Sequence, residues 1–148
     1  MDEQQLRIFV SIIQHYFEAE TGRPAEVGSP FLCDPAQLPV HDFTGVIGIS
    51  GNRKGCVYFS SPREILREML LRAGETDVSD ENLADLAGEI ANTISGNARR
   101  EFGHEFLISV PVVVRGTHQS ISVPRDVRAY VIPFRWHKVD ASLVVSVM

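Results

Sequence analysis

An apolar stripe of helical period near the middle of the chain limits the folds open to this sequence more than any other feature. Its residues recur at the spacings that line one side of an α-helix, and they are Leu83, Leu86, Ala87, Ile90, Ile94 and Ala98. Ser79 is a good capping residue for the start of such a helix, and Gly103 follows Phe102 as a stop signal. The pattern therefore predicts one long helix, from Ser79 to Phe102, that packs along a single side.

Two further helices are expected before this one. The apolar residues of the segment 2–20 also recur at helical spacing, and Thr21-Gly22-Arg23-Pro24 ends that pattern. Ser61-Pro62-Arg63-Glu64 marks a helix start with Ser61 as the cap, and the helix is expected to reach Arg72 or Ala73. Residues 22–41 contain four prolines, which predict a long irregular connection with room for a short strand.

The other apolar segments are rich in Val, Ile and Phe and have the composition of strands. They are Thr44–Ser50, Cys56–Ser60, Phe106–Val114, Val127–Arg135 and Leu143–Val147. Turn-forming residues 51–55 predict that the first two strands form a hairpin. A chain of 148 residues with 44% apolar content has the size of one domain, residues 1–148. We expect an α+β fold with the helices packed on one face of a mostly antiparallel β-sheet.

The side of the long helix opposite the stripe carries an unusual set of residues. A helical projection places there Asp85, Gly88, Glu89, Asn92, Gly96 and Arg99. Each glycine in a helix interior costs about 1 kcal/mol relative to alanine, and asparagine is also a mediocre helix former. Three residues on this one face, Gly88, Asn92 and Gly96, therefore lower the helix propensity. We expect a second macromolecule to approach this face and to bring a reactive group close to Glu89 and Asn92.

The two polar side chains suit different tasks. A neutral carboxamide such as that of Asn92 can donate one hydrogen bond and accept another, so it can orient a water molecule without titrating. The carboxylate of Glu89 can pair with a cation on the partner. Taken alone, however, a Glu-x-x-Asn spacing is common, and a solvated helix face would also explain it.

Composition and charge exclude several classes of protein. The formal net charge of −5 argues against a sequence-independent nucleic-acid binder. No apolar stretch approaches the roughly 20 residues of a membrane span, and residues 1–5 are too acidic and polar for a secretory signal. We therefore expect a cytoplasmic protein that binds neither nucleic acid nor membrane. Cys33 and Cys56 have no metal-binding spacing and are expected to be reduced, structural thiols.

Other candidate chemical sites are weaker. Glu101 and His104 have the spacing used in carboxylate-bridged metal sites, but no second copy exists and Gly103 is expected to end the helix between them. The remaining histidines have no nucleophile motif beside them. The glycines around Asn52 lack the ending of a phosphate-binding loop. We therefore predict no metal ligand set in this chain.

In three stretches, residues 44–55, 88–96 and 108–116, the chain resembles the CheX branch of the CheC/CheX/FliY family of bacterial chemotaxis phosphatases. Gly88-Glu89-Ile90-Ala91-Asn92, followed by Gly96, is similar to the family's signature helix. Residues 44–51, followed by Lys54-Gly55 and an apolar strand, resemble the family's first hairpin. Residues 108–116 resemble the strand after the signature helix. CheC-type members carry two copies of Glu-x-x-Asn, whereas this chain has the one at Glu89 and Asn92, which favours CheX.

The resemblance implies a substrate and a division of roles. The substrate would be the phosphorylated aspartate of a CheY-like response regulator, with Asn92 holding the attacking water and Glu89 pairing with the regulator's active-site lysine. Asp85, Gly88, Gly96 and Arg99 would shape the docking face. The chain would need no cofactor of its own, because the receiver domain supplies its divalent ion, Mg²⁺. CheX proteins act as homodimers, and the strand that ends at Met148 would be a suitable sheet edge for pairing.

Two alternatives stay open at this point. The same fold could bind a response regulator or a flagellar switch component without hydrolysing anything. The bare helix face could also pack against a second copy of the chain in a purely structural dimer.

Overall fold

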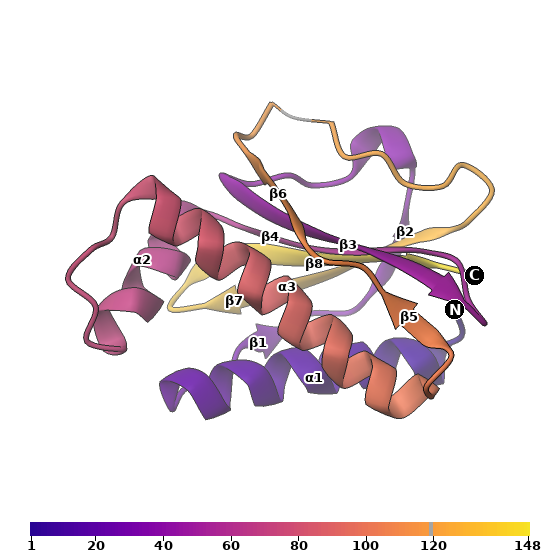
Figure 1. Ribbon diagram of the computed structural model, residues 1–148, viewed down its shortest axis with the longest axis horizontal. Helices are drawn as coiled ribbons and strands as arrows, with labels where there is room; N and C mark the ends of the chain where they lie inside the picture. Colours follow the sequence, from indigo (N-terminus) through magenta and orange to yellow (C-terminus); the bar gives the residue numbers. More distant parts are fainter. Residues whose placement is uncertain (119) are drawn as a thin grey trace.

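The computed structural model describes residues 1–118 and 120–148, and within them it contains three α-helices, one 3₁₀ helix and an eight-stranded sheet (Figure 1). The helices are α1 (Glu3–Thr21), η1 (Pro35–Gln37), α2 (Arg63–Arg72) and α3 (Asp80–Phe102). The strands are β1 (Glu26–Val27), β2 (Phe31–Cys33), β3 (Phe43–Gly51), β4 (Gly55–Ser61), β5 (Phe106–Ile108), β6 (Val112–Arg115), β7 (Ala129–Trp136) and β8 (Val139–Val147).

The sheet is antiparallel throughout the described residues, in the order β1-β7-β8-β4-β3-β5. In addition, β2 pairs with β7 and β6 pairs with β3. The C-terminal strand β8 lies between β7 and β4 and is hydrogen-bonded to both. The expectation that it forms a free edge is therefore wrong. Its residues 141–147 are all buried, which is the pattern of a strand covered on both faces.

The α-helices cover one face of the sheet, as expected, so the α+β fold class is confirmed (Figure 1). The main core lies in this layer. In it Phe9 and Phe17 of α1 and the apolar stripe of α3 meet residues such as Ile47, Val57 and Leu143 of the sheet. A smaller cluster lies on the opposite face, where Tyr58, Val131 and Val144 contact partly buried residues that include Leu38, Ile121 and Val123. Among the described residues, no α-helix contributes to this second cluster.

The long helix begins and ends where the sequence predicts. The Ser79 hydroxyl accepts a hydrogen bond from the Asn82 amide at 3.4 Å, and Gly103 follows Phe102 with a φ of 102°, which favours glycine. All residues of the predicted stripe are fully buried except Leu86, which is partly buried. The hydrophobic period thus placed the correct side of α3 against the core.

The predicted strand 106–114 is interrupted. Ser109 sits between β5 and β6, where its amide donates to the Gly48 carbonyl at 2.9 Å and its hydroxyl accepts from the Gly48 amide at 2.8 Å. Pro111 follows and has no amide hydrogen to give to the ladder. The two short strands both pair with β3, so a pair of local bonds at Ser109 replaces the regular ladder between them.

Residues 22–41 contain more strand than predicted. Both β1 and β2 pair with β7, at Glu26↔Arg135 and at Phe31↔Val131. The last two strands are also displaced from their predicted bounds, because β7 continues to Trp136 and β8 already begins at Val139. A tight turn joins them, in which His137 and Lys138 have φ values of 52° and 63°. Without glycine, asparagine or proline, this turn gives little signal in the sequence.

The start of α2 is capped from a distant residue. Ser61 was expected to be the cap, but its hydroxyl donates to the Pro62 carbonyl and Pro62 occupies the cap position. The Asp42 carboxylate, just before β3, accepts a hydrogen bond from the Arg63 amide at 2.9 Å. A carboxylate near a helix N-terminus also interacts favourably with the helix dipole. This cap could not be predicted from the sequence, because it is a tertiary contact.

We expect Asp42→Ala to lower the free energy of unfolding by about 1 kcal/mol, because the Arg63 amide loses its acceptor. Asp42→Asn keeps an oxygen at this position and should cost less than half as much. Urea unfolding of the three proteins measures the difference. Equal stability of wild type and Asp42→Ala would show that the bond does not cap α2.

Candidate functional site

The exposed side of α3 carries the predicted acid and amide together. Asp85, Glu89, Asn92 and Arg99 are all exposed, and their spacing places them along one ridge of the helix. Glu89 and Asn92 lie one turn apart, so their side chains are neighbours on that ridge. The structure therefore places these four predicted site residues on one solvent-facing surface.

Gly96 and Gly88 differ sharply in their surroundings. A Cβ atom built on Gly96 would meet no atom within 4 Å, so the backbone there is open to an approaching molecule. Gly88 is buried instead, and a Cβ atom on it would lie 3.0 Å from Val113 Cγ2 and 3.7 Å from Pro111. The expectation that Gly88 belongs to the bare face is wrong, because the segment around β6 covers it. Its missing side chain makes room for that segment.

Gly88 belongs to a second buried side of α3 that the sequence reasoning missed. This side consists of small residues only, and they are Ala84, Gly88, Ala91 and Ser95. It packs closely on β3, where a Cβ atom on Gly45 would lie 2.6 Å from the Ala87 carbonyl oxygen and 2.9 Å from Ala91 Cβ. The recurrence of small residues at helical spacing was visible in the sequence. It indicates close helix packing even though it adds little hydrophobicity.

The two flanks of the exposed ridge are therefore different. On one flank the small-residue side runs under Pro111 and Val113. On the other flank α1 packs against α3, with the Phe9 and Phe102 rings 5.9 Å apart. Burial raises the pKa of Tyr16 of α1, and the carboxylates of Glu20 and Glu89 raise it further. Glu89 thus stands close to α1, whose buried Tyr16 lies within its electrostatic range.

Arg99 is held at the far end of the ridge. Its Nη2 donates to the His104 carbonyl oxygen at 3.0 Å, which ties the side chain to the segment after the helix. The guanidinium has further N–H donors for a partner. Arg99 therefore places a positive charge at one end of the ridge, and the carboxylate of Asp85 lies at the other end.

Neither metal ligation nor disulfide bonding emerges from the described residues. They contain no group of three or more His, Cys, Asp or Glu side chains arranged to hold a metal ion. Gly103 ends α3 between Glu101 and His104, as predicted. Cys33 and Cys56 are both free thiols, and burial raises the pKa of Cys56 to about 11. In the same part of the chain, no helix is long and apolar enough to span a bilayer.

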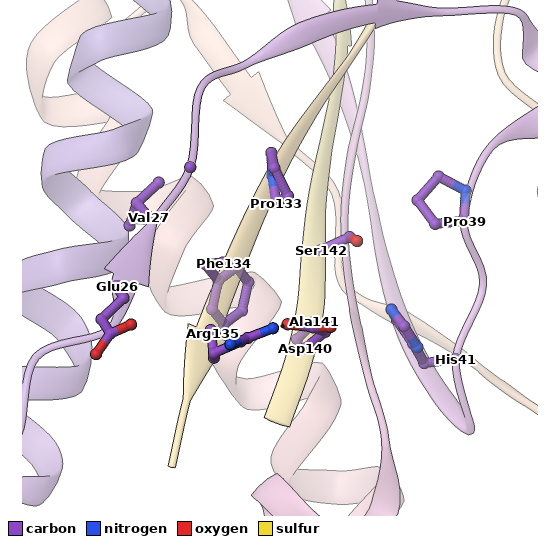
Figure 2. Close-up of a pocket in the computed structure, with 11 residues that line it drawn as sticks. Glu26, Val27, Pro39, His41, Pro133, Phe134, Arg135, Asp140, Ala141 and Ser142 are labelled. Carbon is purple, nitrogen blue, oxygen red and sulfur yellow. Dashed lines mark hydrogen bonds and ion pairs between the residues drawn. The ribbon is translucent and has the colours of Figure 1, made fainter. Parts of the chain in front are cut away.

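A separate cavity of about 520 Å³ lies against β7 and β8, away from the α3 ridge (Figure 2). Its lining includes His41 and the ion pair between Arg135 Nε and Asp140 Oδ1, which are 2.9 Å apart. Partial burial lowers the pKa of His41, while Asp42 and Asp140 act in the opposite direction. The cavity mixes acid, base and apolar groups, and none of the predicted site residues lines it.

Solved structures with the same architecture include proteins of bacterial chemotaxis. A CheC-like superfamily protein from Shewanella sp. PV-4 matches with a TM-score of 0.87 and 24% identity, over 100% of this chain and 99% of the other. The chemotaxis protein CheX from Vibrio vulnificus matches with a TM-score of 0.83 and 21% identity, over 98% and 99% of the two chains. A CheX–CheY–BeF₃–Mg²⁺ complex from Borrelia burgdorferi matches with a TM-score of 0.77 and 18% identity, over 97% of each chain.

The fold is therefore of the CheC/CheX class, with an exposed acid and amide on its longest helix. The family model described as chemotaxis phosphatase CheX matches residues 43–135, which is more than half of the chain. The chain belongs to the CheX family. No curated protein matches the sequence significantly.

Proposed function

We propose that this protein hydrolyses the aspartyl phosphate of a CheY-like response regulator at the exposed ridge of α3. The observation that carries the proposal is the pairing of Glu89 and Asn92, one turn apart and both exposed, beside an open helix backbone at Gly96. Membership of the CheX family supports the general role. The CheX–CheY complex from Borrelia burgdorferi supports a receiver domain as the partner.

In this proposal Asn92 positions the attacking water. An aspartyl phosphate is an activated acyl phosphate, so its hydrolysis needs an oriented water and charge stabilisation more than a strong base. A carboxamide can accept a hydrogen bond from the water and donate one to a phosphoryl oxygen without changing its own charge. Asn92 needs no activating neighbour for this task, which agrees with its exposed position on α3.

Glu89 supplies the orienting contact. A carboxylate one turn before Asn92 can pair with the ammonium group of the receiver's active-site lysine, and this would fix how the receiver sits on α3. Asp85 and Arg99, at the two ends of the ridge, would contact the receiver around the reacting centre. The Mg²⁺ ion would belong to the receiver, so the chain itself would contribute only polar side chains.

The proposal also includes a cytoplasmic homodimer with one ridge in each subunit. The central position of β8 excludes the C-terminal strand as the pairing edge. The ends of the sheet, at β1 and β2 or at β5 and β6, are the strands left with an unpaired side in the described chain.

Decay of a phosphorylated receiver from the same organism, with and without this protein, tests the proposed activity. We expect the protein to shorten the lifetime of the phosphorylated receiver at substoichiometric amounts, since a phosphatase turns over. A protein that binds the phosphorylated receiver and leaves its lifetime unchanged would be a non-catalytic module instead.

Gly96→Ala separates docking from folding. We expect it to raise the free energy of unfolding by about 0.5 to 1 kcal/mol, because alanine is the better helix former and its methyl group meets no other atom. The same methyl group would stand between α3 and a closely docked receiver, so receiver binding should weaken several-fold. Urea unfolding and titration with a BeF₃-activated receiver measure the two effects. Unchanged binding would mean that the receiver does not approach the backbone at Gly96.

A further inference from the structure

Three cationic or polar side chains meet at the tight turn between β7 and β8. Nη2 of Arg72, from α2, lies 2.6 Å from Nε2 of His137, and Nη1 of Arg23, which follows α1, lies 3.4 Å from Nδ1 of the same ring. We call Arg23, Arg72 and His137 the Arg–His–Arg cluster. Its members come from three elements far apart in the sequence, and Figure 1 shows this end of the β7–β8 hairpin close to α2.

Contacts with Trp136 and Glu68 hold the two arginines of the cluster in place. The buried Trp136 donates Nε1–H to the Arg23 carbonyl oxygen at 3.1 Å, which fixes the backbone beneath one guanidinium. The Arg72 guanidinium lies 5.5 Å above the Trp136 ring, and its Nε donates to Glu68 at 3.0 Å. Trp136 thus contacts both arginines. Its indole N–H binds the backbone of Arg23, and its ring lies under the guanidinium of Arg72.

Hydrogen bonding within the cluster is incomplete. An uncharged imidazole has one N–H donor and one lone pair, whereas a guanidinium can only donate. The short Arg72 contact assigns the lone pair to Nε2, so the proton is on Nδ1. Nδ1–H of His137 and the guanidinium of Arg23 then face each other as two donors, 3.4 Å apart. An acceptor that both N–H groups can reach, a water molecule or an anion, would satisfy this pair.

The charge of the surroundings favours an anion as that acceptor. Glu68 pairs with Arg72, but neither Arg23 nor Lys138, the residue after His137 in the turn, has an ion-pair partner within residues 1–118 and 120–148. Loss of solvation and the charges of Arg23 and Arg72 lower the pKa of His137, while Glu68 raises it, so the imidazole is uncharged at neutral pH. Within the cluster, the guanidinium of Arg23 thus has no carboxylate partner, although the formal net charge of the chain is −5.

We propose that the Arg–His–Arg cluster binds an oxyanion of the phosphate class, whose oxygens accept from Arg23 and from Nδ1–H of His137. A phosphate carries negative charge to match the guanidinium of Arg23, and its several acceptor oxygens point in different directions, so it can accept from both donors at once. This site is made by α2, the residues after α1 and the β7–β8 turn, and it is distinct from the α3 ridge. The inference does not depend on the proposed phosphatase activity.

The protein carries its own reporter for this site, because Trp136 is the single tryptophan of the chain. Its fluorescence should respond when an anion binds to Arg23 and His137. The indole N–H donates to the Arg23 carbonyl oxygen, and the Trp136 and His137 ring centroids are 4.4 Å apart. The experiment titrates the full chain at neutral pH and constant ionic strength with inorganic phosphate, with glycerol 2-phosphate and with acetate. We expect a saturable change with inorganic phosphate and a much weaker response to acetate, which has a single charge.

Two variants locate the response. Arg23→Gln should weaken phosphate binding by about tenfold, because it removes a charge-assisted hydrogen bond. Arg128→Gln is the matched control, since Arg128 is exposed beside the other end of β7, and it should leave binding unchanged. Tighter binding of glycerol 2-phosphate than of inorganic phosphate would assign the site to a phosphomonoester on a larger molecule, and the reverse to free phosphate.

The proposal fails if the fluorescence change does not saturate, or if acetate binds as well as phosphate. It also fails if Arg23→Gln and Arg128→Gln behave alike. A water molecule between Arg23 and His137 would then be a sufficient acceptor.

Discussion

Asn92→Ala is expected to abolish the acceleration of receiver dephosphorylation, with a loss of about 10²-fold or more, while the protein stays folded. The reason is that an alanine at this position can neither accept from a water molecule nor donate to a phosphoryl oxygen. Asn92 is exposed on α3, and alanine is the better helix former, so the free energy of unfolding should not fall. Single-turnover decay of the phosphorylated receiver measures the effect.

Asn97→Ala provides the matched control for this prediction. It removes the same carboxamide from the same helix, but the helical period places Asn97 well away from the ridge that carries Glu89 and Asn92. We expect Asn97→Ala to keep wild-type activity. Equal activity losses in the two variants would mean that α3 tolerates no change of this kind, and the result would then say nothing about a catalytic carboxamide.

Gly45→Ala should cause the largest loss of stability among the single-methyl changes considered, about 3 kcal/mol or roughly 10 °C in Tm. The added methyl carbon would lie 2.6 Å from the carbonyl oxygen of Ala87 and 2.9 Å from Ala91 Cβ, so α3 must move away from β3. A backbone carbonyl inside a helix cannot rotate aside as the end of a flexible side chain can. Because α3 also carries the ridge, receiver dephosphorylation should weaken together with stability.

Gly48→Ala tests whether the loss comes from the close packing of α3. Gly48 lies on the same strand but faces the opposite side of the sheet, where an added Cβ atom would lie 3.4 Å from Ser109 Oγ. That is ordinary contact distance, and alanine restricts the unfolded chain more than glycine does, so we expect little change or a small gain in stability. Thermal and urea unfolding measure the stability of both variants. A Gly45→Ala protein as stable as the wild type would contradict the close approach of α3 to β3.

Sequence reasoning predicted the elements whose signals are local. The stripe from Leu83 to Ala98 and the caps at Ser79 and Gly103 identified α3, and the turn around Asn52 identified the β3–β4 hairpin. These signals depend on spacing along the chain and on backbone preferences of single residues. They were sufficient for the α+β class and for the helix that carries the candidate site.

Features that depend on distant contacts were not predicted. The cap of α2 comes from Asp42, the short strands β1 and β2 form only because β7 offers them a partner, and β8 is central because of strand order. Gly88 illustrates the same limit at the site. Its place in the helical projection was close to the exposed ridge, but Pro111 and Val113 cover it, and only the fold brings these residues there.

The most direct test of the proposed phosphatase is the decay rate of the phosphorylated receiver at saturating amounts of wild-type protein and of the Asn92→Ala variant. Saturation removes differences in docking, so the comparison reports the chemical step alone. We predict fast decay with the wild type and a decay with the variant that equals the receiver's own rate. Equal decay rates with the two proteins, both faster than the receiver alone, would contradict the role of Asn92 and the site on α3.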